Sequence, residues 1–281
     1  MTAGTWDVRR FASLPSTNDW LLEQARRGAP SGLVAVADHQ SAGRGRLGRR
    51  WEAPAGRALL LSVLLRPVAP LSSLFACTAA AALSLSEACA EVVGEAPGVK
   101  WPNDLVYPAL DQAEGVDRKV AGILAESDAS APGGRPGSVA VVVGMGCNVD
   151  WEGPPGAGGT SLMARVRGQG AAHVRGSDAH SAARQPVSRE ALLSATLERL
   201  AARVAALDTP EGRRATVADL RRRCVTLGRR VRVEAAGLGT LTGVAESLDD
   251  DGRLVVSSAG GAVVVAAGDV VHLRTAVGEH G

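Results

Sequence analysis

Four arginines and three glycines lie close together in residues 43–51, G-R-G-R-L-G-R-R-W. Glycine lets backbone N–H groups approach a ligand closely, and arginine offers a planar fork that fits phosphate or carboxylate. The segment is therefore typical of a loop that wraps an anion, although a solvated basic loop could have the same composition. It also matches G-x-G-x-x-G, but a strand-like stretch follows where a dinucleotide fold would begin a helix. We therefore expect no Rossmann site.

Residues 100–104, K-W-P-N-D, place a cation, an aromatic ring, an amide and a carboxylate around a proline. So many functional groups in five residues indicate a functional turn. The structural alternative is a strand, turn and strand with Trp101 in the core and a surface ion pair between Lys100 and Asp104. Such an ion pair would contribute little stability.

Further polar or glycine-rich segments interrupt apolar stretches: residues 16–18 (S-T-N), 119–126 (K-V-A-G-I-L-A-E) and 144–148 (G-M-G-C-N). A helix N-cap would explain Ser16 equally well. Gln40, just before the arginine loop, offers both donors and an acceptor. Gly122 permits close approach of a ligand or another backbone. Together these segments could converge on one site.

In order and wording, these segments resemble the motifs of the biotin–protein ligases: S-T-N, Q-x-A-G-R-G-R-x-G-R-x-W, K-W-P-N-D, K-x-A-G-I-L-x-E and G-x-G-x-N. All five occur here in that order, and the resemblance covers about residues 10–275. It implies an α+β fold with a class II synthetase-like mixed sheet flanked by helices, followed by a small SH3-like β-barrel. We expect a catalytic domain at residues 1–226, the barrel at 227–275 and a tail at 276–281.

The resemblance also implies a two-step reaction. Biotin and ATP form biotinoyl-5′-AMP and pyrophosphate, and biotin then passes to one lysine of a biotin carboxyl carrier domain of an acyl-CoA carboxylase. ATP and Mg²⁺ are the implied cofactors, with biotin as substrate. We expect no protein ligand of the metal, because Mg²⁺ binds largely through nucleotide phosphates.

Roles for individual residues follow from the same resemblance. The biotin-binding residues are expected to be Ser16, Thr17, Asn18, Gln40, Gly43, Arg44, Lys119 and Gly122. The residues expected to bind ATP or the adenylate are Arg44, Gly45, Arg46, Arg49, Trp51, Lys100, Asn103 and Asn148. Lys119, Asp104 and Arg46 are the expected catalytic residues.

Elementary chemistry gives these residue types their tasks. Fixed cations must offset the repulsion between the biotin carboxylate and the α-phosphate. The acceptor lysine must be neutral to attack, yet at pH 7 an unperturbed lysine is neutral in only about one molecule in 2,500. Asp104 is therefore expected to orient this lysine.

Three alternatives stay open. A lipoate–protein ligase would share the fold and chemistry but bind a dithiolane without a ureido group, and Gln40 beside the arginine loop favours biotin. A non-catalytic protein could bind anions or nucleic acid through the loop, or a carrier through the barrel. Some family members also carry an N-terminal DNA-binding helix-turn-helix, but because 15 residues precede Ser16 we expect no specific DNA binding.

The pattern of the chain predicts the elements that position these residues. A helix is expected from the Ser16 cap to about Gly28, with Asp19 at its third position, and a buried helix at residues 71–93. Strands are expected at 34–37, 58–65, 119–126 and 139–146, the last two as neighbours, and helices at 189–207 and 215–225. Residues 164–187 lack apolar periodicity and are predicted to be a loop. Five short strands follow at 230–234, 239–246, 254–257, 262–266 and 269–272.

Composition excludes several classes of protein. The chain has 281 residues, is 46% hydrophobic and carries a formal net charge of +2, so disorder and a broad nucleic-acid footprint are not expected. Its four cysteines lack the spacing of a zinc site or a disulfide framework. The N-terminus has no apolar core, and residues 71–93 contain Glu87 and Glu91, so we expect a cytoplasmic protein without a signal peptide or membrane span.

Overall fold

Seven strands form one sheet in the order β1-β2-β3-β7-β6-β5-β4, and five form a second in the order β11-β10-β9-β8-β12. In this computed structural model, the described residues are 6–108, 116–173, 186–235, 239–266 and 268–273. The strands of the first sheet are β1 Asp7–Leu14, β2 Leu33–Gln40, β3 Ala58–Leu65, β4 Gly98–Lys100, β5 Asp104–Tyr107, β6 Arg118–Asp128 and β7 Ala140–Asn148. Those of the second are β8 Arg230–Ala235, β9 Gly239–Leu248, β10 Leu254–Ser258, β11 Gly261–Val265 and β12 Asp269–His272. The helices are α1 Thr17–Arg26, α2 Phe75–Val93, α3 Leu162–His173, α4 Arg189–Val204 and α5 Pro210–Arg223, with 3-10 turns η1 Arg46–Gly48, η2 Leu71–Ser73 and η3 Ala205–Asp208.

The first sheet is mixed. β1 and β2 run parallel, whereas the other neighbouring pairs are antiparallel. The predicted α+β class is therefore confirmed, as is the pairing of β6 with β7, which sets Gly122 opposite Gly146. β1 has no counterpart among the predicted strands, because it lies at the sheet edge, exposes most of its residues and carries little apolar alternation.

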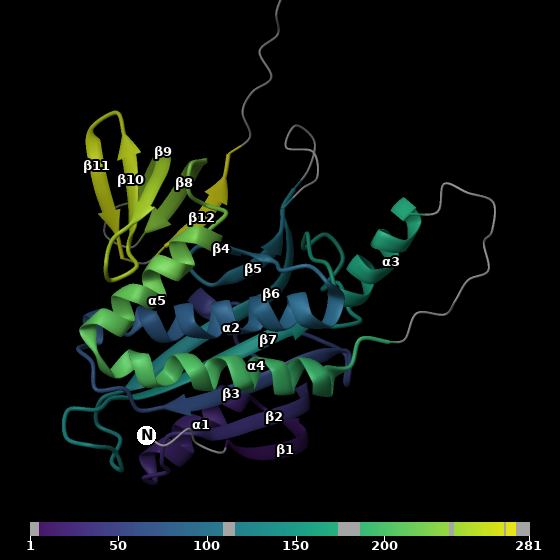
Figure 1. The fold of residues 1–281 in the computed structure, drawn as a ribbon, viewed down its shortest axis with the longest axis vertical. Helices are drawn as coiled ribbons and strands as arrows, with labels where there is room; N and C mark the ends of the chain where they lie inside the picture. The colour runs from purple at the N-terminus through teal and green to yellow at the C-terminus, as the bar shows by residue number, and fades with distance from the viewer. Residues whose placement is uncertain (1–5, 109–115, 174–185, 236–238, 267, 274–281) are drawn as a thin grey trace, which may run out of the picture.

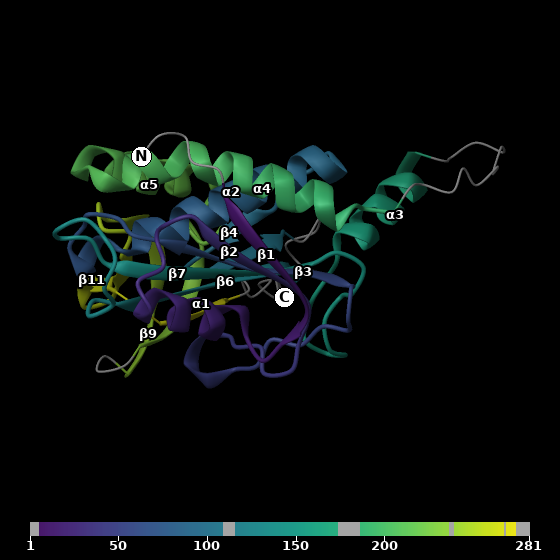
Figure 2. The same ribbon diagram turned by 90° about the horizontal axis from the view of Figure 1, so that it is seen from below.

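Helices cover both faces of this sheet. Figure 2 shows α2, α4 and α5 on one face and α1 on the other. α2 is apolar over most of its surface because it packs against the sheet on one side and α4 on the other. By length and composition Leu71–Val93 could cross a membrane, but 72% of its most apolar stretch is buried inside the protein, which is typical of the central helix of a core.

α1 begins at the predicted cap. The Asp19 amide donates to Ser16 Oγ at 3.3 Å, which confirms Ser16 as N-cap. One side of the helix buries Leu21, Leu22 and Ala25 in an apolar cluster with residues of β2, β3 and β7. This packing holds residues 16–18 at a fixed place over the sheet.

The predicted loop at residues 164–187 is wrong for its first part, because α3 continues to His173. The Ala164 amide donates to Ser161 Oγ at 3.1 Å, and Leu162 is buried at the start of the helix. This local cap and anchor replace the apolar periodicity that the segment lacks. Residues 174–185 lie outside the described part of the chain, as does the predicted tail at 276–281.

The second sheet shares its core with the first part of the chain. One apolar cluster runs from α2 and α4 through the first sheet to residues of β8, β9, β10, β11 and β12, and Figure 1 shows the second sheet beside β4, β5 and α5. The five predicted strands are all present. All four cysteines are free and buried, as expected.

Candidate active site

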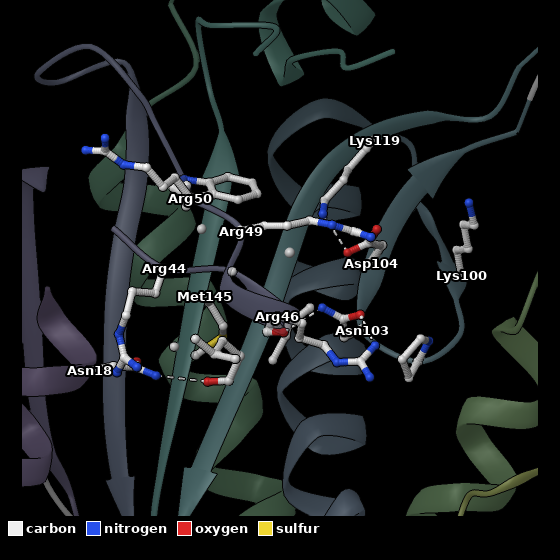
Figure 3. Close-up of a pocket in the computed structure, with 18 of the residues that line it drawn as sticks. Asn18, Arg44, Arg46, Arg49, Arg50, Lys100, Asn103, Asp104, Lys119 and Met145 are labelled. Carbon is white, nitrogen blue, oxygen red and sulfur yellow. Dashed lines mark hydrogen bonds and ion pairs between the residues drawn. The ribbon is translucent and has the colours of Figure 1, made fainter. Parts of the chain in front are cut away.

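A cavity of about 330 Å³ brings together segments from the whole length of the chain. It lies between the start of α1, the arginine loop, the ends of β5, β6 and β7, and β12. Predicted site residues that line it are Ser16, Thr17, Asn18, Gln40, Arg44, Gly45, Arg46, Arg49, Trp51, Lys100, Asn103, Asp104, Lys119 and Gly122. Figure 3 shows Asn18 and Arg44 at one end, and Arg46, Asn103, Asp104 and Lys119 at the other.

Two predicted residues lie elsewhere. Gly43 closes the base of the arginine loop, where its carbonyl accepts from the Trp51 amide at 3.0 Å. An added Cβ at Gly43 would come within 2.4 Å of the Trp51 carbonyl oxygen, so this position requires glycine for packing. Asn148 is buried, donates to the Thr160 carbonyl at 3.0 Å and lines an adjoining cavity of about 560 Å³. Lys100, Asp104 and Lys119 line both cavities.

Neutral polar groups line the end of the cavity that lies at the start of α1. Gln40 Oε1 accepts from the Thr17 amide at 2.7 Å and from Thr17 Oγ1 at 2.9 Å. Because this oxygen is already used, the amide nitrogen is the group that Gln40 can offer to a ligand.

Asn18 is held by the protein itself. Its Nδ2 donates to the Leu124 carbonyl at 3.2 Å and to Glu126 at 2.8 Å, and its Oδ1 lies 2.6 Å from Ser62 Oγ. An added Cβ at Gly144 would meet this Oδ1 at 2.2 Å, so a glycine of β7 makes room for the amide. Asn18 therefore shapes the wall of the cavity.

The arginine loop is a short hairpin. Arg44 and Arg50 form an antiparallel bridge, and the Gly45 amide donates to the Arg49 carbonyl at 2.7 Å. Leu47 at its tip has φ of 55°, the left-handed region that is uncommon for a residue with a Cβ. Figure 3 shows the Arg50 side chain pointing away from the other labelled groups.

The arginines of this loop differ in their charge partners. Arg44 Nη2 lies 2.5 Å from Asp19 and 2.7 Å from Glu126, so two carboxylates already offset its charge. Arg49 forms an ion pair with Asp269 of β12. Neighbouring carboxylates therefore offset the positive charges of Arg44 and Arg49 in this structure.

Arg46 and Lys100 are the cations of the site without an ion-pair partner among the described residues. Both are partly buried, and burial lowers the pKa of each side chain, an effect that the nearby charge of Asp104 opposes. Arg46 Nη1 donates only to neutral oxygens, those of the Asn103 side chain and the Gly268 carbonyl, each at 3.3 Å. A desolvated cation without a counterion attracts an anion strongly.

Lys119 and Asp104 form an ion pair between β6 and β5, with Nζ 2.7 Å from Oδ1. This pairing replaces the predicted alternative of Lys100 with Asp104. Trp101 is buried in the core as that alternative expected, and the Trp101-Pro102 peptide is cis. Asn103 Nδ2 donates to the Ile123 carbonyl at 2.9 Å, which ties the turn to β6.

The indole of Trp51 packs directly against two glycines of the sheet, Gly122 of β6 and Gly146 of β7. An added Cβ at Gly146 would come within 2.5 Å of Trp51 Cε2, and one at Gly122 within 3.1 Å of Cζ3. The close approach predicted at Gly122 is thus made by Trp51 itself. Lys119 Nζ lies 5.5 Å from the ring centroid, within the range of a cation–π contact. Trp51 Nε1 is buried without a hydrogen-bond partner in the described residues.

Sequence reasoning missed several residues of the site. Ser62 is a buried hydroxyl within the otherwise apolar strand β3, and that single polar residue was the available signal. Asp269, Val270 and Val271 bring the second sheet to the cavity wall. Their sequence neighbourhood carries no such signal, because only the packing of the two sheets places them there.

Comparison with known proteins agrees with the geometry. Residues 10–148 match the Biotin/lipoate A/B protein ligase family, and residues 226–273 match the Biotin protein ligase C terminal domain. The biotin–[acetyl-CoA-carboxylase] ligase of Mycobacterium tuberculosis is 38% identical over 94% of this chain and 88% of the relative. This chain belongs to the biotin protein ligase family.

Other biotin protein ligases extend the comparison. The biotin–[acetyl-CoA-carboxylase] ligase of Paracoccus denitrificans is 31% identical over 92% of this chain and 98% of its own length. The structure of the biotin protein ligase from Aquifex aeolicus in complex with biotin and ATP aligns with a TM-score of 0.71 over 96% of this chain and 99% of that chain, at 23% identity. That likeness shows a shared fold for the two biotin protein ligases.

Proposed function

We propose that this biotin protein ligase joins biotin to ATP and transfers the biotinoyl group to a lysine of a biotin carboxyl carrier domain. The polarity of the cavity is the observation that carries the proposal. Neutral donors and acceptors gather at Thr17 and Gln40, while Arg46 and Lys100 present unpaired positive charge at the other end. Biotin has the matching polarity, with a neutral ureido ring at one end and a carboxylate at the other.

In the first step two anions must meet. Arg46, Lys100 and Lys119 surround the place where the biotin carboxylate would approach the α-phosphate. Because Arg46 and Lys100 have no carboxylate partner among the described residues, neither must break an ion pair with the protein before it binds an anion. Biotinoyl-5′-AMP and pyrophosphate are the products of this step.

The remaining predicted roles are assigned by position. We assign Ser16, Thr17, Asn18, Gln40 and Arg44 to the biotin end, with Gly43 at the base of the loop behind Arg44. We assign Gly45, Arg46, Arg49, Trp51, Lys100 and Asn103 to the nucleotide side, and Asn148 to the adjoining cavity on that side. The catalytic part is assigned to residues 1–226 and the small barrel to residues 227–275.

In the second step the acceptor lysine must be held near the adenylate and must lose a proton before it attacks. Asp104 lines both cavities and so can be reached from either. We assign Asp104 the role of orienting that lysine. Lys119, its partner in the free enzyme, turns to the anion of the adenylate when the acceptor arrives.

Mg²⁺ is assigned to the phosphates of ATP. No group of three His, Cys, Asp or Glu side chains in the described residues is arranged to hold a metal ion. A magnesium–nucleotide complex needs few protein ligands, because the ion binds largely through the phosphates. When bound, the ion would neutralise phosphate charge and assist departure of pyrophosphate. A cytoplasmic enzyme would meet both ATP and the carboxylase carrier.

A lipoate–protein ligase is the competing activity. One assay separates the two: the purified chain is incubated with ATP, Mg²⁺ and a biotin carboxyl carrier domain, with either biotin or lipoate, and the carrier is weighed by mass spectrometry. We expect one biotinoyl group per carrier and no lipoyl group. Addition of lipoate without biotin would reverse the assignment, and addition of neither would contradict ligase activity.

A further inference from the structure

A chain of hydrogen bonds connects the second sheet to the turn that carries Asn103 and Asp104. His272, at the end of β12, has Nδ1 2.7 Å from Asp117 Oδ2 and Nε2 3.1 Å from Thr226 Oγ1. The same Thr226 oxygen accepts from the Trp101 amide at 3.0 Å. Thr226 is fully buried, and the side chains of His272 and Asp117 are 12% and 9% exposed.

The direction of each hydrogen bond follows from the chemistry of its groups. Nδ1 of His272 lies 2.7 Å from Asp117 Oδ2 and 3.1 Å from Arg229 Nη1. A carboxylate only accepts, so the shorter contact assigns the ring proton to Nδ1, and Arg229 Nη1 donates instead to Asp117 Oδ2 at 2.8 Å. Nε2 is then an acceptor and receives the hydroxyl proton of Thr226. With its proton directed at His272, the Thr226 oxygen presents its lone pairs to the Trp101 N–H.

The charges around His272 favour this neutral ring. Burial lowers its pKa, the positive charges of Lys100 and Arg229 lower it further, and Asp117 acts in the opposite direction. Arg229 Nη1 lies 2.8 Å from Asp117 Oδ2, so the carboxylate is held by two partners. These are the charged groups that face His272 from the neighbouring elements.

The second sheet also holds the other side of Trp101. The indole Nε1 donates to the Gly252 carbonyl, in the turn between β9 and β10, at 2.9 Å. The backbone of this buried residue is thus fixed by Thr226, in the turn between α5 and β8, and its side chain by the turn between β9 and β10. The cavity-lining residues Asn103 and Asp104 follow within three positions.

We propose that His272 is a positioning residue: by fixing the hydroxyl of Thr226 it sets the backbone at Trp101 and thereby the place of Asn103 and Asp104 in the cavity. Through His272 the second sheet then affects the chemistry, although His272 itself does not touch the reacting atoms. The inference rests on the proposed function, because its kinetic readout is biotin transfer.

Two matched pairs of variants test it. Thr226→Val removes the hydroxyl at similar volume, whereas Thr226→Ser keeps it. His272→Leu removes the ring acceptor, whereas His272→Gln places an amide oxygen near the position of Nε2. Biotin transfer from preformed biotinoyl-AMP to the carrier is measured in single turnovers, with biotin affinity measured separately and folding checked by circular dichroism.

We expect Thr226→Val and His272→Leu to slow transfer about ten- to a hundredfold, the scale of a small misplacement of reacting groups. Biotin affinity should change by less than about twofold, because the biotin end of the cavity lies at the start of α1, away from the hydrogen bonds of His272 and Thr226. The serine and glutamine variants should restore most of the rate. Equal rates in all variants, or equal losses in transfer and biotin affinity, would overturn the inference.

Hydrogen exchange at the Trp101 amide gives a readout that needs no activity. It should be slow in the unaltered protein and in both conservative variants, and faster in His272→Leu, where Thr226 is still present. An unaltered protein that transfers no biotin would contradict the proposed function, and the exchange rate would still decide the inference. Unchanged exchange in a folded His272→Leu protein would overturn it.

Discussion

Lys119 Nζ lies 2.7 Å from Asp104 Oδ1, which joins the only predicted catalytic lysine to the only predicted catalytic carboxylate. The pair leaves Arg46 and Lys100 as the unpaired cations of the described site. An anion that enters can therefore bind these two groups first. Lys119 and Asp104 can separate later, when the acceptor lysine supplies a second partner for the carboxylate.

Asp104→Asn should spare adenylate formation and slow transfer. The amide keeps the shape of the side chain but can neither hold the acceptor lysine by charge nor accept its proton, a role worth about 10²-fold or more in rate. Pyrophosphate release reports the first step, and carrier labelling by mass spectrometry reports the second. Asp38→Asn is the control, because Asp38 pairs with Arg189 outside the cavity. An equal fall in both steps would show that the two roles are not divided.

Arg46→Gln should reduce adenylate formation by about 10²-fold, the typical effect of one lost charge-stabilising donor. Arg46 is partly buried and has no counterion in the described site, so glutamine removes charge that nothing else replaces. Arg50→Gln in the same loop is the matched control: Arg50 also lines the cavity, but it has Glu52 as a charge partner and its guanidinium points away from the other labelled groups (Figure 3). Equal losses in both variants would indicate a general effect of loop charge.

The sequence was enough to predict which residues meet in the cavity, but not which of their charges are paired with one another. Polar and glycine-rich motifs stand out from apolar strands, so residues such as Gln40, Asp104 and Lys119 could be expected to meet. Arg49 is different, because its partner Asp269 lies 220 residues away in a second sheet whose docking no local pattern encodes. The same limit applies to β1, an edge strand with little apolar alternation, and to α3, whose start depends on a single cap at Ser161.

Ser62→Ala should destabilise the protein and loosen the biotin end. The change leaves the oxygen of Asn18 without its buried donor, at a cost of about 1–3 kcal/mol in the free energy of unfolding. Urea unfolding and equilibrium binding of biotin measure the two effects. Ser13→Ala, an exposed serine that contacts His39, should stay within about 0.5 kcal/mol of the unaltered protein. Unchanged stability of Ser62→Ala would show that water replaces the hydroxyl.

Acid should weaken the junction of the two sheets in two stages. Burial lowers the pKa of His272 in the folded protein, so the unfolded chain takes up the proton first and stability falls as the pH drops below about 6.5. For Asp117, burial would raise the pKa, but the hydrogen bond from His272 and the charge and hydrogen bond of Arg229 lower it overall. Its contribution is therefore lost at more acidic pH, below about 4.

Unfolding free energies of the unaltered protein and of His272→Gln, compared from pH 8 to pH 5, test the first stage. The difference between the two curves should change with a slope of at most one proton, about 1.4 kcal/mol per pH unit. Parallel curves for His272→Gln would mean that His272 titrates alike in the folded and unfolded states.

Gly146→Ala should force the indole of Trp51 off the floor of the cavity. The new Cβ would lie 2.5 Å from Trp51 Cε2, a distance that requires the ring or the strand to move, and such overpacking costs about 1–3 kcal/mol. Because the cost arises from one contact, it should largely vanish in a Trp51→Ala background, so a double-mutant cycle isolates it. Gly168→Ala in α3 is the control, since no atom lies within 4 Å of its added Cβ. If the loss of stability persists without Trp51, the added Cβ strains β6 and β7 themselves. The glycines would then be required for the packing of the sheet and not for that of the indole.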